Sequence, residues 1–421
     1  MTDSNVLCRH FGECGGCLNQ DVPYEQQLAL KQAALQKLFR EFWHAPIPIT
    51  PSPVVWHYRN KVDPSFALQW YPEPPPAGFE RDTVLGFKQK GKWFRPLEIE
   101  ECRIGPAGLD ALLQGVREWR QQCGLRACGP RKRQGYLRNL LVRDGKRSGE
   151  RMVALITMPG PFEHSDSFVA MVNRCFNAAS IYHGEFAGRA DVATADKLTL
   201  LYGRNSIQEI LEVPESDNIT SNPSDPSDPS GPSDEPHSRS LIFRISPLSF
   251  FQTNPLAAER LYGHIRAWAA QRTPDVLFDL YGGSGGVALS CADCASEIIS
   301  VENVAAATED GCANASTNNV DNVFFVTDSM RNYLRNKIES GGFPEGSAVV
   351  VDPPRAGMHP KAVRRLIQLY PQHVLYVSCN PKRLREELPA FLEAYHLVEL
   401  QAVDMFPHTP HVEALAVFER R

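Results

Sequence analysis

The sequence predicts an α/β protein whose C-terminal part forms a parallel sheet and whose central part forms a smaller, β-rich domain. Short apolar runs, typical of buried parallel strands, alternate with helical stretches from residue 240 onward. A segment that cannot form a core precedes this part of the chain. The length of 421 residues also exceeds that of one typical domain. The expected segments are 1–44, 45–213, 214–239 and 240–421.

Composition indicates a protein of the cytoplasm. Hydrophobic residues make up 43% of the chain and charged residues 22%, as in globular proteins. No stretch approaches the roughly 18 uncharged apolar residues that a membrane helix needs, and the start lacks the basic and then apolar pattern of a signal peptide. We therefore expect a soluble cytoplasmic protein with no membrane partner, and we infer no obligate protein partner.

Three of the eleven cysteines lie close together near the N-terminus. Cys8, Cys14 and Cys17 are separated by five and two residues, and the glycines between them let the backbone wrap around a bound centre. Cys102 is the nearest downstream candidate for a fourth thiolate. Thiolates bind both iron–sulfur clusters and zinc, and His10 is an alternative ligand for zinc. The spacing predicts a metal site and leaves the metal open.

The helical spacing of apolar residues predicts a helix over 23–42, to which we assign packing and no chemistry. Strand-like runs at 137–142 and 152–157 indicate the β-rich domain that follows. The segment from Pro214 to Pro236 contains a Ser-Asp-Pro repeat and is expected to be a disordered linker. It also holds six acidic residues and no Lys or Arg, so it accounts for the formal net charge of −5.

Five apolar runs in the C-terminal part are interpreted as buried parallel strands. They are 276–281, 297–301, 324–326, 348–351 and 374–377. Two further strands, around 397–403 and 412–419, are joined by too few residues for a crossover helix, so they should pair antiparallel. A parallel sheet that ends in such a hairpin is typical of a class I, Rossmann-like methyltransferase domain. The predicted fold class is therefore α/β, with this domain, a smaller β-rich central domain and an N-terminal cysteine cluster.

Candidate binding residues follow the ends of these strands. A glycine-rich turn at 282–286 follows the first strand, where a ligand can approach the backbone closely. Glu302 ends the second strand, where its carboxylate can accept hydrogen bonds from both hydroxyls of a ribose. These two features suit a nicotinamide dehydrogenase as well as a methyltransferase. Asp352, in an Asp-Pro-Pro-Arg motif, and Cys379, in a Ser-Cys-Asn-Pro motif, favour the methyltransferase.

Taken together, the motifs resemble those of the RNA uracil-C5 methyltransferase family, which makes 5-methyluridine with S-adenosylmethionine. The resemblance covers nearly the whole chain, and the motifs occur in the same order. They are the N-terminal cysteines, Tyr58-Arg59-Asn60-Lys61, Ser249-Phe250-Phe251-Gln252-Thr253-Asn254, the cofactor turn, Asp352-Pro353-Pro354-Arg355, Ser378-Cys379-Asn380-Pro381 and Asp404-Met405-Phe406-Pro407-His408-Thr409.

The resemblance implies roles for individual residues. Cys379 matches the nucleophile and Glu413 the base. The positions that match cofactor contacts are Gln252, Tyr281, Glu302 and Asp352. The positions that match ligands of a 4Fe–4S cluster are Cys8, Cys14, Cys17 and Cys102. The chain departs from the family at Gly282, where cysteine or serine is usual, and at Lys382-Arg383-Leu384, which replaces a commoner threonine-containing continuation.

The chemistry of uracil explains why these residue types are needed. Carbon 5 is a poor nucleophile, so a thiolate must first add to carbon 6 and create an enolate that attacks the methyl group. A strand end that is polar and partly exposed is expected to lower the pKa of Cys379. After methyl transfer a carboxylate, here Glu413, must remove the proton on carbon 5. His408 and His411 flank this base and are candidates to orient it or to contact RNA, with a structural role favoured. Phe250 and Phe251 are more typical of a core than of base stacking.

The target base must be unpaired or flipped, which favours single-stranded or looped RNA. Seven basic residues and one acidic residue lie between Arg131 and Arg147, a pattern that favours phosphate contact over a merely solvated basic face, and Arg59 and Lys61 extend this track. The resemblance favours ribosomal RNA of the large subunit, because members that act on transfer RNA commonly lack the cluster cysteines. This chain is also expected to begin at the cluster, without the TRAM domain that precedes it in some relatives, which resembles the shorter large-subunit enzymes. The alternatives are a transfer RNA enzyme, a catalytically silent RNA-binding protein and a nicotinamide oxidoreductase.

Overall fold

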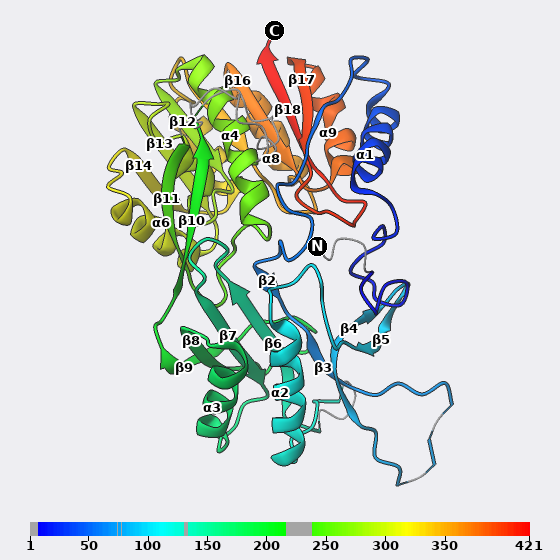
Figure 1. Cartoon of the computed structure of the whole chain (residues 1–421). Coiled ribbons are helices and arrows are strands. Elements are labelled where there is room, and N and C mark those ends of the chain that lie inside the picture. The colour runs from blue at the N-terminus through cyan, green and yellow to red at the C-terminus, as the bar shows by residue number, and fades with distance from the viewer. Residues whose placement is uncertain (1–6, 74, 77, 130–133, 216–237) are drawn as a thin grey trace, which may run out of the picture. The chain divides into compact units, whose positions relative to one another are not determined.

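The protein folds into two compact units, each built from separate stretches of the chain (Figure 1). The computed structural model describes residues 7–73, 75–76, 78–129, 134–215 and 238–421. The first unit comprises residues 1–23, 55–209 and 245–248, and the second comprises residues 24–54, 210–244 and 249–421. Of the linker predicted over 214–239, residues 216–237 lie outside the described residues; residue 214 ends β10 (Ile207–Pro214), and residues 238–239 begin β11 (Ser238–Ile245), the two strands of a two-stranded sheet.

An eight-stranded sheet forms the centre of the second unit, in the order β1-β17-β18-β16-β15-β12-β13-β14. Its strands are β1 (Ile49–Thr50), β12 (Val276–Leu280), β13 (Glu297–Glu302), β14 (Val323–Thr327), β15 (Ala348–Val351), β16 (His373–Ser378), β17 (Tyr395–Val403) and β18 (Glu413–Arg420). Strands β12 to β16 pair in parallel, and β18 runs antiparallel to both β16 and β17. The predicted parallel strands and the closing hairpin are confirmed. All four residues of β15 are buried, which explains its uninterrupted apolar sequence.

Seven helices accompany this sheet in the part of the chain that the structure describes. They are α1 (Tyr24–Phe39), α4 (Pro255–Arg272), α5 (Gly286–Ser290), α6 (Ala305–Thr317), α7 (Met330–Glu339), α8 (Pro360–Leu369) and α9 (Pro381–Leu392). Helix α1 contacts α9 (Figure 1). Its Leu35 and Phe39 join the apolar core of the sheet. The helix predicted over 23–42 is therefore present and packs as expected, but it also buries the polar side chains of Gln27 and Lys31.

The first unit contains a second, mostly antiparallel sheet, in the order β5-β4-β3-β6-β7-β8-β9, with β2 paired to β6. Its strands are β2 (Lys61–Val62), β3 (Ser65–Leu68), β4 (Thr83–Gln89), β5 (Lys92–Glu98), β6 (Leu137–Asp144), β7 (Arg151–Thr157), β8 (Ser180–Glu185) and β9 (Lys197–Gly203). Helices α2 (Leu109–Gln122) and α3 (Ser165–Phe176) share its core. The predicted strands at 137–142 and 152–157 are β6 and β7. No helix within the described ranges is long and apolar enough to cross a membrane.

Candidate active site

Four of the predicted site residues lie at the carboxyl ends of parallel strands in the second unit. Strand β12 leads into Tyr281, β13 ends at Glu302, β15 precedes Asp352 and β16 precedes Cys379. Because these strands pair in parallel, their carboxyl ends meet at one edge of the sheet, which is where α/β folds bind ligands. The sheet topology therefore gathers side chains that are up to a hundred residues apart in the sequence.

Three of the four predicted cofactor residues, Gln252, Tyr281 and Asp352, line one pocket at this edge. The other lining residues are Phe250, Phe251, Tyr262, Asp279, Gly282, Gly283, Ser284, Gly286 and Val287. The fourth predicted residue, Glu302, does not line the pocket but accepts a hydrogen bond from the backbone N–H of Gly283 at 3.2 Å. Its carboxylate is therefore held against the glycine-rich turn.

The backbone of this turn adopts conformations that favour glycine. The φ angles are +55° at Gly283 and +89° at Gly285, and Tyr281 itself has a φ of +68°. A left-handed backbone at a non-glycine residue is uncommon and tends to occur at functional sites, where surrounding structure holds it. A Cβ at Gly286 would lie 2.3 Å from the hydroxyl of Tyr262, so the helix α5 that follows starts in close contact with α4.

The departure at Gly282 has a local structural explanation. A Cβ there would lie 1.9 Å from Ser300 Oγ and 2.7 Å from Asp279 Oδ2, and Ser300 donates a hydrogen bond to the same carboxylate oxygen at 3.1 Å. Ser300, on the neighbouring strand β13, therefore fills the space that a side chain at position 282 would occupy.

We expect Gly282→Ala to destabilise the protein by about 1–3 kcal/mol, because the added methyl group overpacks the contact with Ser300 and Asp279. Thermal unfolding of the variant would measure this loss. The double variant Gly282→Ala/Ser300→Ala should recover part of it, because removing the hydroxyl makes room. Additive losses in the double variant would contradict this steric account.

Three carboxyl groups interact electrostatically at this pocket: Asp279 and Asp352, which line it, and Glu413, which is influenced by the charge of Asp352. Burial raises the pKa of Asp279 to about 7. The pKa of Asp352 is also raised to about 7, by loss of hydration and then by the charge of Asp279. Burial and the charge of Asp352 raise the pKa of Glu413 well above its ordinary value. The sequence analysis did not identify Asp279 as a site residue. A single acidic residue inside the apolar run of β12 could have indicated it.

The thiol of Cys379 shares this acidic environment. Its pKa is raised to about 12, first by burial and then by the charges of Glu413 and Asp352, while Arg355 acts in the opposite direction. The expectation that the strand end lowers this pKa is therefore wrong, because the nearby carboxyl groups and the loss of hydration outweigh the single arginine. The ligand-free site thus favours a neutral thiol.

The two phenylalanines before Gln252 differ in their surroundings. Phe251 is buried and packs against Phe243 with ring centroids 5.5 Å apart. Phe250 is 63% exposed and lies over the cofactor turn, with its Cδ1 3.7 Å from the Cβ position of Gly283. The core assignment therefore holds for Phe251 and fails for Phe250, whose ring is available for contact with a ligand.

The two histidines near Glu413 also differ. His408 is buried, and its backbone N–H donates to Gln27 Oε1 at 2.8 Å. His411 is exposed, and its ring lies 3.3 Å from the guanidinium of Arg355. Asn380 donates to the carbonyl of Arg355 at 3.0 Å, so the segments that follow β15 and β16 are also joined. The structural role assigned to His408 agrees with these contacts.

The four N-terminal candidate ligands line a single pocket of about 600 Å³ in the first unit. Cys14 Sγ accepts a hydrogen bond from the backbone N–H of Gly16 at 3.4 Å. Burial raises the pKa of Cys17 to about 12 and of Cys102 to about 11, and neighbouring cysteine thiols add to both shifts. Among the residues that the structure describes, no group of three or more His, Cys, Asp or Glu side chains is arranged to hold a metal ion.

Some basic side chains of the predicted track form contacts within the first unit and do not extend their charge into solvent. Arg143 is 1% exposed and donates to the carbonyl of Pro247 at 2.9 Å. Lys146 forms a largely buried ion pair with Asp144 at 2.7 Å. Arg138 donates to backbone carbonyls at 186, 188 and 190. Arg143 and Lys146 are therefore unsuited to phosphate contact, Arg138 is only partly buried, and residues 131–133 lie outside the described part of the chain.

Comparisons with known proteins identify related sequences and a similar structure. A family model described as tRNA (Uracil-5-)-methyltransferase matches residues 235–421. An uncharacterized RNA methyltransferase from Clostridium tetani is 32% identical, over 98% of this chain and 84% of its own length. A tRNA (uracil(54)-C(5))-methyltransferase from Pyrococcus furiosus is 30% identical, over 98% of this chain and 85% of its own.

A solved structure is similar over almost the full length. It is that of Pyrococcus abyssi tRNA (uracil-54, C5)-methyltransferase in complex with S-adenosyl-L-homocysteine. The TM-score is 0.71 and the sequence identity 26%, and the match covers 96% of this chain and 85% of that one. Both units of the fold are therefore represented in a protein with a bound product of methyl transfer.

Proposed function

Because the chain belongs to the uracil-C5 RNA methyltransferase family, whose members use S-adenosylmethionine, we propose that it methylates carbon 5 of a specific uridine in RNA with Cys379 as nucleophile and Glu413 as base. The observation that carries this proposal is the shared electrostatic environment of Cys379, Asp352 and Glu413 beside the pocket at the carboxyl edge of the sheet. Family membership leaves no support for the nicotinamide oxidoreductase alternative.

In the proposed reaction the residues act in sequence. The thiolate of Cys379 adds to carbon 6 of uracil, and carbon 5 then attacks the methyl group of S-adenosylmethionine, whose carbon–sulfur bond breaks to leave S-adenosylhomocysteine. Glu413 then removes the proton from carbon 5, and the carbon–sulfur bond breaks to release 5-methyluridine and the thiolate. Gln252, Tyr281, Glu302 and Asp352 are proposed to hold the cofactor, whose methyl donor is cationic. Phe250, which is exposed beside this pocket, is suited to stacking on the flipped base.

The cationic cofactor provides a reason for the raised pKa of Cys379. A positive charge beside Asp352 offsets the negative charges that disfavour the thiolate, so cofactor binding should activate the nucleophile. Without the cofactor, the thiol would stay neutral and would not react with other electrophiles. The acidic surroundings would thereby couple cysteine activation to loading of the methyl donor.

This coupling predicts how alkylation of Cys379 depends on pH. Because only the thiolate reacts, alkylation of the ligand-free protein should be slow at neutral pH and increase toward pH 12. Sinefungin, whose amine adds a positive charge near the methyl position, should shift the profile to lower pH, and neutral-sulfur S-adenosylhomocysteine should not. Iodoacetamide labelling followed by peptide-resolved mass spectrometry measures this. Equal profiles with the two ligands would contradict the coupling.

For the substrate, we propose large-subunit ribosomal RNA, with transfer RNA as the second candidate. The cysteine set of the first unit supports the first, since it resembles that of the ribosomal RNA enzymes. The name of the Pyrococcus furiosus relative supports the second. Mapping 5-methyluridine in both RNA classes, from cells with and without the gene, separates the two.

We also propose that Cys8, Cys14, Cys17 and Cys102 hold a 4Fe–4S cluster with a structural role. Their four thiols line one pocket, and Gly16 supplies an N–H donor to Cys14 Sγ, an arrangement suited to bound thiolate. Burial disfavours the negatively charged thiolates, and a bound cluster would supply the positive iron charge that stabilises them in place of the thiol protons. Protein purified without oxygen should show a broad visible absorption band. A colourless protein that contains zinc would contradict the cluster.

The experiment that tests the proposed reaction uses RNA containing 5-fluorouridine. When fluorine replaces the hydrogen on carbon 5, the base has no proton to remove after methyl transfer. In the presence of S-adenosylmethionine the methylated RNA should therefore stay covalently bound to the protein. Denaturing gel electrophoresis would show the adduct. Absence of the adduct with wild-type protein and both RNA classes would contradict the mechanism.

A further inference from the structure

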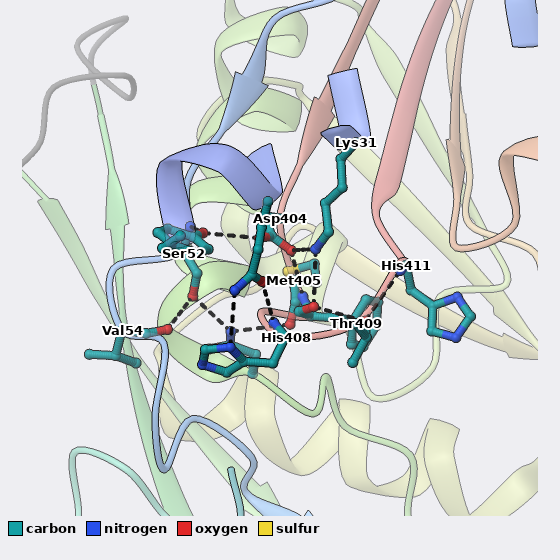
Figure 2. Close-up of polar contacts among 12 residues, drawn as sticks. Lys31, Ser52, Val54, Asp404, Met405, His408, Thr409 and His411 are labelled. Atoms are coloured by element: carbon teal, nitrogen blue, oxygen red, sulfur yellow. Dashed lines mark hydrogen bonds and ion pairs between the residues drawn. The ribbon is translucent and has the colours of Figure 1, made fainter. Parts of the chain in front are cut away.

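The loop that leads from β17 to the proposed base is buried at residues 404–405 and 407–409 and exposed at residues 410 and 411, and it is joined to helix α1 by side chains of that helix (Figure 2). Residues 403 and 413 pair across the hairpin, so the loop starts and closes directly beside Glu413. Glu413 Oε2 is buried and has no hydrogen-bond partner among the described residues. Side-chain bonds to that oxygen therefore do not orient the carboxyl group, and its position depends on the backbone that carries it.

Four hydrogen bonds around Asp404 and Phe406 fix the beginning of this loop. Lys31 Nζ donates to Asp404 Oδ1 at 2.7 Å and to the carbonyl of Phe406 at 3.1 Å (Figure 2). Tyr24 donates to Asp404 Oδ2 at 3.0 Å, and the backbone N–H of Phe406 donates to Oδ1 at 3.0 Å. The side chains of Lys31 and Asp404 are 3% and 0% exposed, so this ion pair has little freedom to rearrange.

A second contact fixes the middle of the loop. Gln27 Oε1 accepts from the backbone N–H of His408 at 2.8 Å, and Gln27 Nε2 lies 3.1 Å from His408 Nδ1. A backbone N–H can only donate, so the amide oxygen must face it, and the amide nitrogen must then donate to Nδ1. His408 has a φ of +65°, a conformation that a non-glycine residue keeps only when its surroundings hold it.

We propose that Gln27 and Lys31 are positioning residues that place Glu413 for removal of the carbon 5 proton, an inference that rests on the proposed function. Gln27 contacts both the backbone N–H and the side chain of His408, and Lys31 forms an ion pair with Asp404. Helix α1 thereby determines the path of the loop to Glu413. The helix to which the sequence assigns only packing thereby becomes part of the catalytic apparatus. The affected step is proton removal, after cysteine addition and methyl transfer.

The test compares Gln27→Met with Gln36→Met. Gln36 lies on the same helix and also forms two hydrogen bonds, from Nε2 to Ala45 O at 2.9 Å and from Ile47 N to Oε1 at 3.2 Å, but neither involves the loop. Both variants lose an amide that takes part in two side-chain contacts, but Gln27 is buried and Gln36 only partly buried, so Gln27→Met is expected to lose more thermal stability. Only Gln27→Met should slow release of tritium from [5-³H]uridine RNA, by on the order of 10²-fold, because small misplacements of a catalytic group have effects of that size.

The readout that separates positioning from general destabilisation is the covalent intermediate. On natural RNA, Gln27→Met should accumulate the methylated adduct, whereas Gln36→Met should not, and Gln27→Glu, which keeps the acceptor for His408 N–H, should recover part of the rate. Equal tritium release and equal adduct levels in the two methionine variants would overturn the inference while leaving the proposed function intact. If wild-type protein forms no 5-fluorouridine adduct, the proposed function fails instead.

Discussion

Replacing Cys379 with alanine is expected to lower methyl transfer to RNA by on the order of 10⁴- to 10⁶-fold, the range typical of removing a catalytic nucleophile. Without a thiolate on carbon 6, carbon 5 does not become an enolate, and the bound methyl donor has no nucleophile to attack it. The loss should therefore fall on kcat, with little change in cofactor binding. Transfer of a radioactive methyl group to RNA measures the effect.

Two measurements show that the loss is chemical. Cys379→Ala should give no adduct with 5-fluorouridine RNA, while S-adenosylhomocysteine should still raise its melting temperature, because the alanine leaves the pocket residues in place. Cys312→Ala is a matched control, since Cys312 is an exposed thiol on α6 of the same unit. An undiminished adduct with Cys379→Ala would mean that another cysteine is the nucleophile.

The architecture of the second unit could be predicted from the sequence because its strands carry unambiguous patterns. The apolar runs at 276–281 and 348–351 correspond to β12 and β15, and the short connection after 403 correctly predicted an antiparallel hairpin. The motifs at the strand ends also placed Asp352 and Cys379 at one edge of the sheet. These inferences succeed because strand direction follows from chain connectivity alone.

The electrostatics of the site could not be predicted in the same way. The pKa of Cys379 depends on how deeply the thiol is buried and on its closeness to Asp352 and Glu413, which come from different strands. Sequence spacing carries neither quantity. The polarity of the neighbouring residues suggested a lowered pKa, but burial and two carboxyl groups raise it.

Helix α1 illustrates the same limit for polar side chains. Its apolar spacing identifies Leu35 and Phe39 as core residues, and the structure agrees. Gln27 and Lys31 look like ordinary surface residues of an amphipathic helix, yet both are buried. Their partners lie more than 370 residues further along the chain, at Asp404 and His408. Only the folded structure shows that these polar residues face a loop in need of donors and acceptors.

Replacing Glu413 with glutamine is expected to lower turnover by about 10²- to 10⁴-fold and to trap the protein on its natural substrate. The amide cannot accept the carbon 5 proton, so the reaction should stop after methyl transfer, with Cys379 still bonded to carbon 6. Denaturing gels of the variant with unmodified RNA should therefore show a covalent adduct that wild-type protein resolves. Glu399→Gln, at an exposed position on β17, is the control and should behave like wild type.

The stability of Glu413→Gln separates catalysis from folding. Burial and the charge of Asp352 raise the folded-state pKa of Glu413 above its unfolded value of about 4.3. Between these two pKa values the folded protein binds the proton more tightly than the unfolded chain does, so wild-type protein loses stability as pH rises from the lower value to the higher one. Glutamine cannot ionise and does not have this pH dependence. The melting temperature of the variant minus that of wild type should therefore increase as pH rises from about 4 to 8. A variant that is inactive but at least as stable as wild type at pH 8 would assign the loss to the missing base. An inactive variant that accumulates no adduct would show instead that Glu413 acts before methyl transfer, and the order of steps would have to be revised.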